Sequence, residues 1–149
     1  MARYVMIALV AALAAAWPGT RPTLAAEGVP APPRHRVVLE LTSDATASWE
    51  AVLNNIENAR KALGPDQTTV ELVVHGPGIG LVTRANPMGQ ARMEGLAAQG
   101  VVFAACRNTM NRKKLTDADL QPFVTVVPAG VAEVVMKQEA GWSYLKAGH

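Results

Sequence analysis

The run Val-Val-Phe-Ala-Ala-Cys at residues 101–106 decides the predicted fold. Its first five residues are all apolar, so it lacks the apolar–polar alternation of a strand with one face in water. An uninterrupted apolar run of this length is typical of a parallel strand that helices cover on both faces. Gly100 precedes the run as the predicted stop of a helix, and the strand ends directly at Cys106.

Strands and helices are predicted to alternate on both sides of this run. Further β-rich runs occupy residues 36–42, 69–74, 123–127 and 142–145. Apolar residues at three- and four-residue spacing predict helices over 49–63, 88–99 and 131–140, with a single helical turn over 116–120. This order predicts a sheet of mostly parallel strands with helices on both faces.

Three local expectations accompany these elements. The first helix is expected to use one of three N-caps, Ser43, Asp44 or Thr46. Residues 75–80 are predicted to form a tight turn, followed by a helical stretch that Asn86-Pro87 interrupts before the stronger part at 88–99. The last helix is expected to bury three valines, Val131, Val134 and Val135.

Residues 1–26 have the layout of a secretory signal peptide. A basic start and an apolar run from Tyr4 to Trp17 precede a Pro-Gly break and small residues, and cleavage is predicted after Ala25 or Ala26. The run is shorter than the roughly 20 residues that span a bilayer, although an uncleaved anchor is the alternative. Residues 27–34 form a predicted Pro-rich linker, and residues 35–149 form one domain. A periplasmic protein without stable membrane insertion is therefore expected.

The charge balance excludes one class of partner. The sequence has 14 basic and 12 acidic residues, and the leader contains Arg3 and Arg21 but no acid. Cleavage thus leaves 12 basic residues against 12 acidic ones. A nucleic-acid-binding protein would show a strong excess of basic residues, so this protein is not expected to bind nucleic acid.

Cys106 is the only cysteine of the chain and the main candidate for chemistry. It cannot form an intramolecular disulfide, so its thiol is buried and inert, reactive, or paired between chains. Ligands of parallel sheets bind beyond the carboxyl ends of the strands, where Cys106 and His75 both follow a predicted strand. Arg107 and a helix or turn that begins after the cysteine would lower its pKa.

Four segments resemble the DsrE/DsrF-like family of sulfur-relay proteins: Gly100–Thr109, His75–Gly78, Val126–Val131 and Glu139–Leu145. The resemblance extends from His35 to the C-terminus. It implies a three-layer α/β/α sandwich with a mostly parallel five-stranded sheet, and assembly into a homotrimer or homohexamer. It also implies a cysteine that accepts sulfane sulfur as a persulfide, at the position of Cys106. The predicted leader is a departure, because several members of the family work in the cytoplasm.

Other residues near Cys106 are candidates for supporting roles. His75 would orient a sulfur donor or act as a base, or would instead cap a backbone group at the end of its strand. The charge of Arg107 would favour the thiolate. Asn108 and Thr109 would hold the loop around the thiol by side-chain to backbone hydrogen bonds.

No cofactor or metal is expected. The three histidines, His35, His75 and His149, show no metal-ligand spacing with the cysteine. The glycines at 76, 78 and 80 lack the spacing of a dinucleotide-binding loop.

Two functions are consistent with these residues. The first is an exported sulfur carrier or sulfurtransferase that holds sulfane sulfur on Cys106, with small sulfur species or donor and acceptor proteins as partners. The alternative is a non-catalytic oligomeric binding protein with a structural cysteine. Whether the protein turns over as an enzyme is left open by the sequence.

Overall fold

The structure is a computed structural model, and it describes residues 35–147. The predicted leader at 1–26 and the predicted linker at 27–34 lie outside the described residues. Within the described part of the chain, no helix is both long and apolar enough to cross a membrane.

A sheet of five parallel strands forms the centre of the domain. The strands lie side by side in the order β4-β3-β2-β1-β5, and each neighbouring pair is parallel. Their bounds are β1 His35–Leu41, β2 Thr68–Val74, β3 Val102–Cys106, β4 Val124–Val127 and β5 Ser143–Lys146. The predicted class, an α/β fold with a mostly parallel five-stranded sheet, is confirmed.

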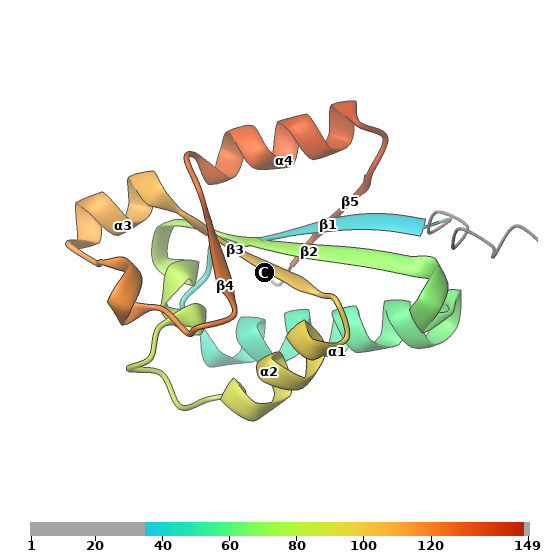
Figure 1. Ribbon diagram of the computed structural model, residues 1–149, viewed down its shortest axis with the longest axis horizontal. Helices are drawn as coiled ribbons and strands as arrows, with labels where there is room; N and C mark the ends of the chain where they lie inside the picture. The colour runs from blue at the N-terminus through green and yellow to red at the C-terminus, as the bar shows by residue number, and fades with distance from the viewer. Residues whose placement is uncertain (1–34, 148–149) are drawn as a thin grey trace, which may run out of the picture. The chain divides into compact units, whose positions relative to one another are not determined.

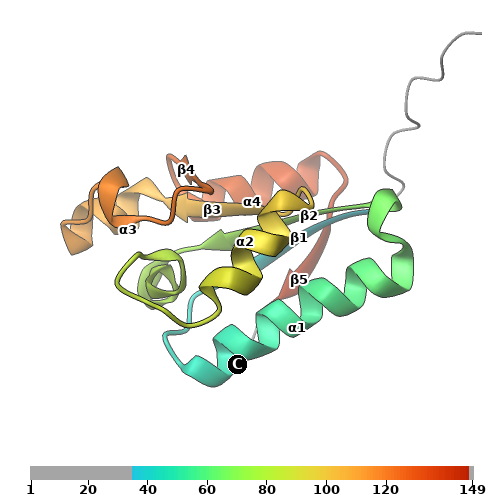
Figure 2. The same ribbon diagram turned by 60° about the horizontal axis from the view of Figure 1, so that its bottom comes forward.

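Helices cover both faces of the sheet, so the domain has the three predicted layers. The α-helices are α1 Thr46–Leu63, α2 Gln90–Ala98, α3 Arg107–Lys113 and α4 Gly130–Glu139. Short 3₁₀ helices form at η1 Pro65–Gln67, η2 Gly76–Val82 and η3 Asp117–Asp119. Figures 1 and 2 show α1 and α2 on one face and α4 on the other.

The two faces of the sheet differ in polarity. Alternate strand residues such as Leu39, Leu72 and Phe103 point into the large core beneath α1 and α2. The face beneath α4 carries a smaller apolar cluster around Val38, Val73 and Ala104. Besides α4, only Trp142 among the described residues outside the sheet packs against that cluster, so this face also has room for polar side chains, and the candidate site lies on it.

Two predicted details at the helices are wrong. The N-cap of α1 is Ala45, and its side chain makes no cap, whereas the Ser43 hydroxyl accepts a hydrogen bond from the Ala45 amide. In α4 only Val134 of the three valines is buried, and Val131 and Val135 are exposed. The buried face of α4 instead follows residues 130, 134 and 137, so the other two valines point outward.

Residues 76–82 form the 3₁₀ helix η2 rather than the predicted tight turn and the start of a longer helix. The α-helix begins only at Gln90, after a break around Asn86-Pro87. Close packing explains the glycine in the middle of η2. A Cβ at Gly78 would lie 2.4 Å from the carbonyl oxygen of Leu41, so no larger residue fits where η2 crosses the end of β1.

Candidate functional site

Cys106 lies at the carboxyl edge of the sheet, on the face beneath α4. It is the last residue of β3 and the N-cap residue of α3. Its neighbour on the same face of β3, Ala104, belongs to the apolar cluster under α4. Because side chains alternate along a strand, Cys106 points toward the start of α4. The residue is 5% exposed, so it lies just below the surface.

Several hydrogen-bond donors surround the Cys106 sulfur. Burial raises the pKa of the thiol, but hydrogen bonds from the Gly130 amide, from the amide and hydroxyl of Thr109 and from the Asn108 amide together lower it below its ordinary value. Hydrogen bonds to the charged form favour ionisation. These amides are free to donate to the sulfur because they lie in the first turns of two helices, α3 directly after the cysteine and α4 from Gly130.

Thr109 is the side chain that joins the neighbouring loops at the site. It is almost fully buried, and its hydroxyl oxygen accepts a hydrogen bond from the Gly76 amide at 3.0 Å. The same hydroxyl donates to Cys106. Thr109 therefore connects the start of η2, which follows β2, to the start of α3, and this connection orients the donor that it presents to the sulfur.

His75 and Cys106 both lie against Gly130 at the start of α4. A Cβ at Gly130 would be 3.1 Å from Cδ2 of His75 and 3.2 Å from Cβ of Cys106, so the two side chains border the same space beside the α4 backbone. The His75 Nε2 atom lies 2.6 Å from Oε1 of Glu40. The interpretation of His75 as a cap of a backbone group is therefore wrong, because its partner is a carboxylate.

Glu40 connects His75 to the edge of the sheet. The Tyr144 hydroxyl on β5 donates a hydrogen bond to Oε2 of Glu40 at 2.8 Å. Burial raises the pKa of Glu40, but the hydrogen bonds from His75 and Tyr144 and the charge of His75 lower it overall. The carboxylate is thus charged at neutral pH, and it fixes the His75 ring beside the α4 N-terminus.

The other two predicted residues contribute differently from expectation. The Arg107 guanidinium forms an ion pair with Asp117 at 2.6 Å and is substantially exposed. The lowered pKa of Cys106 comes from the hydrogen bonds named above, and Arg107 is not among its causes. The Asn108 side chain is exposed, and this residue acts on the thiol through its backbone amide.

Sequence reasoning did not identify Gly130, Glu40 or Tyr144 as parts of the site. The available signal for Glu40 was an acidic residue between the apolar residues Leu39 and Leu41 near the end of β1. Gly130 stood within a segment that resembled the family, but its amide reaches Cys106 only through the fold. Tyr144 is 104 residues from Glu40 in the sequence, so no local pattern joins them.

The site can supply a nucleophilic thiolate with a hydrogen-bonded environment for its charge. Among residues 35–147, no cluster of three or more His, Cys, Asp or Glu side chains is arranged to hold a metal ion.

The chain is similar to a known protein family and to solved structures. A model of the DsrE/DsrF-like family matches residues 36–147. Among solved structures, the protein of unknown function MTH1491 from Methanobacterium thermoautotrophicum is similar, with 28% sequence identity and a TM-score of 0.71 over 75% of this chain and 98% of that one. The ychN protein from E. coli shares the fold, with 15% identity and a TM-score of 0.63 over 76% of this chain and 98% of that one. No curated protein matches this chain in sequence.

Proposed function

Because the chain belongs to the DsrE/DsrF-like family, we propose that it is an exported sulfur carrier or sulfurtransferase whose Cys106 holds sulfane sulfur as a persulfide. The observation that carries the proposal is the set of donors from Asn108, Thr109 and Gly130 that lower the pKa of the Cys106 thiol. A thiolate is the nucleophilic form of cysteine, and a lowered pKa makes more of it available at neutral pH.

The proposed reaction is a transfer of one sulfur atom. The Cys106 thiolate attacks the outer sulfur of a persulfide R–S–SH, forming a bond between the two sulfurs. The S–S bond of the donor breaks, and its electron pair leaves with R–S⁻. With thiosulfate as donor the leaving group is sulfite. The protein then carries Cys–S–SH, whose outer sulfur a second thiolate removes in the same way, which regenerates Cys106.

The surroundings of Cys106 would stabilise a negative charge on the thiolate and on the persulfide alike. The donors of Gly130 and Thr109 are fixed by the backbone of two helices, so they need no rearrangement to stabilise an anionic sulfur. A persulfide anion extends one atom beyond the thiolate and would meet the same region. We propose that His75, fixed by Glu40, borders the space that this outer sulfur occupies.

One observation favours the second candidate function, a binding protein with a structural cysteine. Cys106 is only 5% exposed, and buried cysteines often serve as small core residues. Labelling separates the two candidates. A reactive carrier reacts with iodoacetamide at neutral pH in its native state, whereas a structural cysteine reacts only after the protein is unfolded.

Intact-protein mass spectrometry tests the proposed function directly. We expect the protein to gain the mass of one sulfur atom after incubation with thiosulfate, polysulfide or glutathione persulfide, and to lose it on reduction. Cys106→Ser should fold but gain nothing, because its hydroxyl does not ionise near neutral pH. If the wild type gains no sulfur from any donor and Cys106→Ser is strongly destabilised, Cys106 is a packing residue and the binding protein is the correct reading.

The exported state is a separate part of the proposal and rests on the sequence of residues 1–26. The apolar run is too short to remain as an anchor, and small residues follow it. We expect the mature chain to begin at Ala26 or Glu27. N-terminal sequencing of protein from the cell envelope measures this, and a sequence that begins at Met1 would contradict it.

A further inference from the structure

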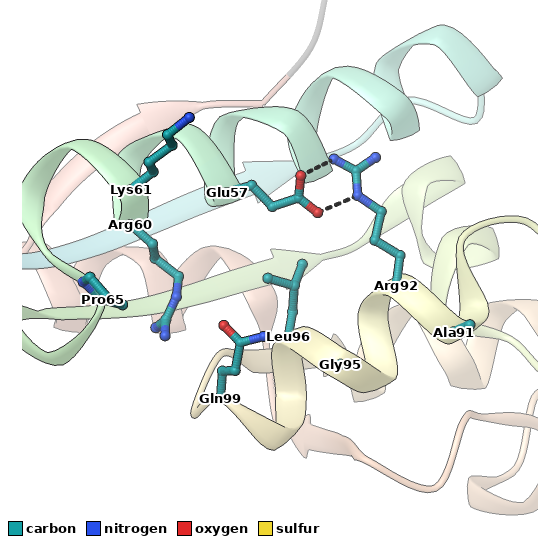
Figure 3. A pocket seen from close by; sticks show the side chains of 9 residues that line it. All are labelled: Glu57, Arg60, Lys61, Pro65, Ala91, Arg92, Gly95, Leu96 and Gln99. Atoms are coloured by element: carbon teal, nitrogen blue, oxygen red, sulfur yellow. Dashed lines mark hydrogen bonds and ion pairs between the residues drawn. The ribbon is translucent and has the colours of Figure 1, made fainter.

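A cavity far from Cys106 lies between α1 and α2. It has a volume of about 550 Å³, within the range of small-molecule pockets, and its wall includes Arg60, Arg92, Gly95, Leu96 and Gln99 (Figure 3). The helices α1 and α2 cover the sheet face opposite α4. Residues near the C-terminal ends of α1 and α2 line the cavity, and the chain continues from these ends into β2 and β3. It therefore lies toward the amino ends of the strands, whereas Cys106 lies at the carboxyl ends.

The two arginines in the wall differ in how their charges are balanced. Arg92 donates to both carboxylate oxygens of Glu57, at 2.5 and 2.7 Å, and to Asn54 at 2.7 Å. This ion pair joins α2 to α1 at one end of the cavity, as Figure 3 shows. The charge of Arg92 is thus already neutralised within the protein.

Arg60 has no such carboxylate partner. It is 7% exposed, and its guanidinium donates one hydrogen bond, to the carbonyl oxygen of Thr68 at 3.3 Å. Within the described part of the chain, Arg60 takes part in no ion pair. Among the described residues no buried side-chain nitrogen or oxygen lacks a hydrogen-bond partner, so the remaining guanidinium nitrogens of Arg60 are open to the cavity, where an anion can accept charge-assisted hydrogen bonds from them.

Figure 3 shows charged side chains at both ends of the cavity and the apolar side chain of Leu96 between them. Arg60 extends from α1 toward Gln99 at the end of α2, and Leu96 points from α2 toward α1 between Arg60 and Arg92. Pro65, beside Arg60, and Ala91, beyond Arg92, add apolar surface at the two ends of the cavity. A planar guanidinium beside a side-chain amide matches a carboxylate, which can accept two parallel hydrogen bonds from arginine.

Gly95 keeps the space open. It lies in the middle of α2, where glycine costs about 1 kcal/mol relative to alanine. Packing does not require it, because a Cβ built there would have no heavy atom within 4 Å. The absent side chain leaves free volume that would otherwise be filled from α2.

From the unpaired Arg60, the open volume at Gly95 and the apolar wall, we infer that this cavity binds a small organic carboxylate with a compact apolar body. The carboxylate lies against Arg60 and Gln99, and the apolar body lies against Leu96 and Gly95. This site is independent of the sulfur chemistry proposed for Cys106.

Titration of the full chain with benzoate, followed by NMR of backbone amides, tests the inference. We expect saturable shifts at residues of α1 and α2 with a dissociation constant of about 1 mM or below. Benzamide, which lacks the charge, and inorganic sulfate, which lacks the apolar body, should each bind about tenfold more weakly or worse. Cys106→Ser should bind benzoate as the wild type does, whatever its sulfur loading.

Two variants probe the cavity without depending on the stability of Arg60 replacements. Gly95→Leu places a side chain into open space and improves helix propensity, so it should fold at least as stably and weaken benzoate binding by about tenfold or more. Ala98→Leu adds the same bulk at an exposed position of α2 outside this cavity and should leave binding unchanged. Arg60→Gln should weaken binding to a similar extent as Gly95→Leu.

The inference is overturned by any of four results: no saturable binding of benzoate, undiminished binding in Gly95→Leu, equal affinity for benzamide, or equal affinity for sulfate.

Discussion

At the scale of single residues, the environment of Cys106 combines burial with a concentration of donors. Burial alone would raise the pKa of the thiol and leave it inert, but the donors from three residues reverse the sign. Two of these donors are amides at the start of α3, and another is the first amide of α4. The placement of these donors by the backbone, more than any charged side chain, thus favours the thiolate form of Cys106 at the end of β3.

The lowered pKa predicts the pH dependence of alkylation. Because ionisation of Cys106 extends to lower pH than that of an ordinary thiol, its reaction with iodoacetamide should reach half its maximal rate at a lower pH than that of a free cysteine thiol measured alongside. Thr109→Val removes the hydroxyl donor and should move this midpoint upward, whereas Thr109→Ser keeps the hydroxyl and should not. Rates measured from pH 5 upward by mass spectrometry check this, and an unchanged midpoint in Thr109→Val would contradict the role of the hydroxyl.

Gly130 permits a second test at the same scale. In Gly130→Ala the added methyl group would lie 3.1–3.2 Å from His75 and Cys106, so the start of α4 must move away from the sulfur. The Gly130 amide then donates a weaker hydrogen bond, and the thiol pKa should rise. We expect alkylation at neutral pH to slow by about threefold to tenfold with a folded far-UV spectrum. The same change at Gly95, where a Cβ meets nothing, is the control and should leave the rate unaltered.

At the scale of elements, a buried ion pair attaches α4 to the sheet. Lys137 lies 2.5 Å from Glu71 of β2, 3.5 Å from Glu133, and 4.5 Å from the centre of the Trp142 ring. Glu71 is almost fully buried, and this burial raises its pKa even though Lys137 acts in the opposite direction. Since α4 supplies the Gly130 amide, this pair also helps to hold the Cys106 site together.

Lys137→Met should therefore reduce stability in a pH-dependent way. It leaves the Glu71 carboxylate buried without its cation, which costs about 3 kcal/mol near neutral pH. A carboxyl with a raised pKa in the folded state binds its proton more tightly there than in the unfolded chain, so the loss should shrink as the pH falls toward the ordinary value of glutamate. Urea unfolding at about pH 7 and pH 5 measures this. Glu71→Gln combined with Lys137→Met should recover part of the loss, and a pH-independent loss would contradict the explanation.

The sequence predicted the order and type of the main elements because each signal is local. The apolar run 101–105 and the helical spacing before Leu63 correspond to β3 and α1. Side-chain orientation in α4 was not predictable in this way. The buried face of α4 includes the long aliphatic stem of Lys137, whose amine reaches Glu71. A prediction that places valines in the core before lysines therefore assigns the wrong face of the helix.

The candidate site could be predicted only in part from the sequence, because most of its contacts join distant segments. Cys106 and His75 could be placed at one edge because both follow strands of a parallel sheet. Apart from the Thr109 hydroxyl, the donors that lower the thiol pKa are backbone amides, which leave no trace in residue type. The partner of His75 comes from β1, 35 residues away, and becomes visible only when the strands are arranged in space.

At the scale of the whole molecule, exposed apolar side chains lie on the outer side of α4 and on the edge strand β5. Val131, Val135 and Met136 are exposed on α4, and Tyr144 and Leu145 are exposed on β5. A small domain leaves much of its apolar surface in water unless it associates. Together with the family of the chain, this surface leads us to propose that the mature protein forms a homotrimer or a multiple of it.

Light scattering of the mature chain at micromolar concentration tests this assembly. We expect the mass of a trimer or hexamer, and we expect Val135→Glu to shift the population toward monomer, because it places a charge in the apolar surface of α4 that association would bury. Ala98→Glu, at an exposed residue of α2 on the opposite face of the sheet, is the control and should leave the mass unchanged. Both variants should melt within a few degrees of the wild-type monomer, since neither side chain is part of the core. A wild-type protein that stays monomeric at this concentration would refute the assembly, and dissociation by Ala98→Glu but not by Val135→Glu would place the interface on the α2 side of the domain.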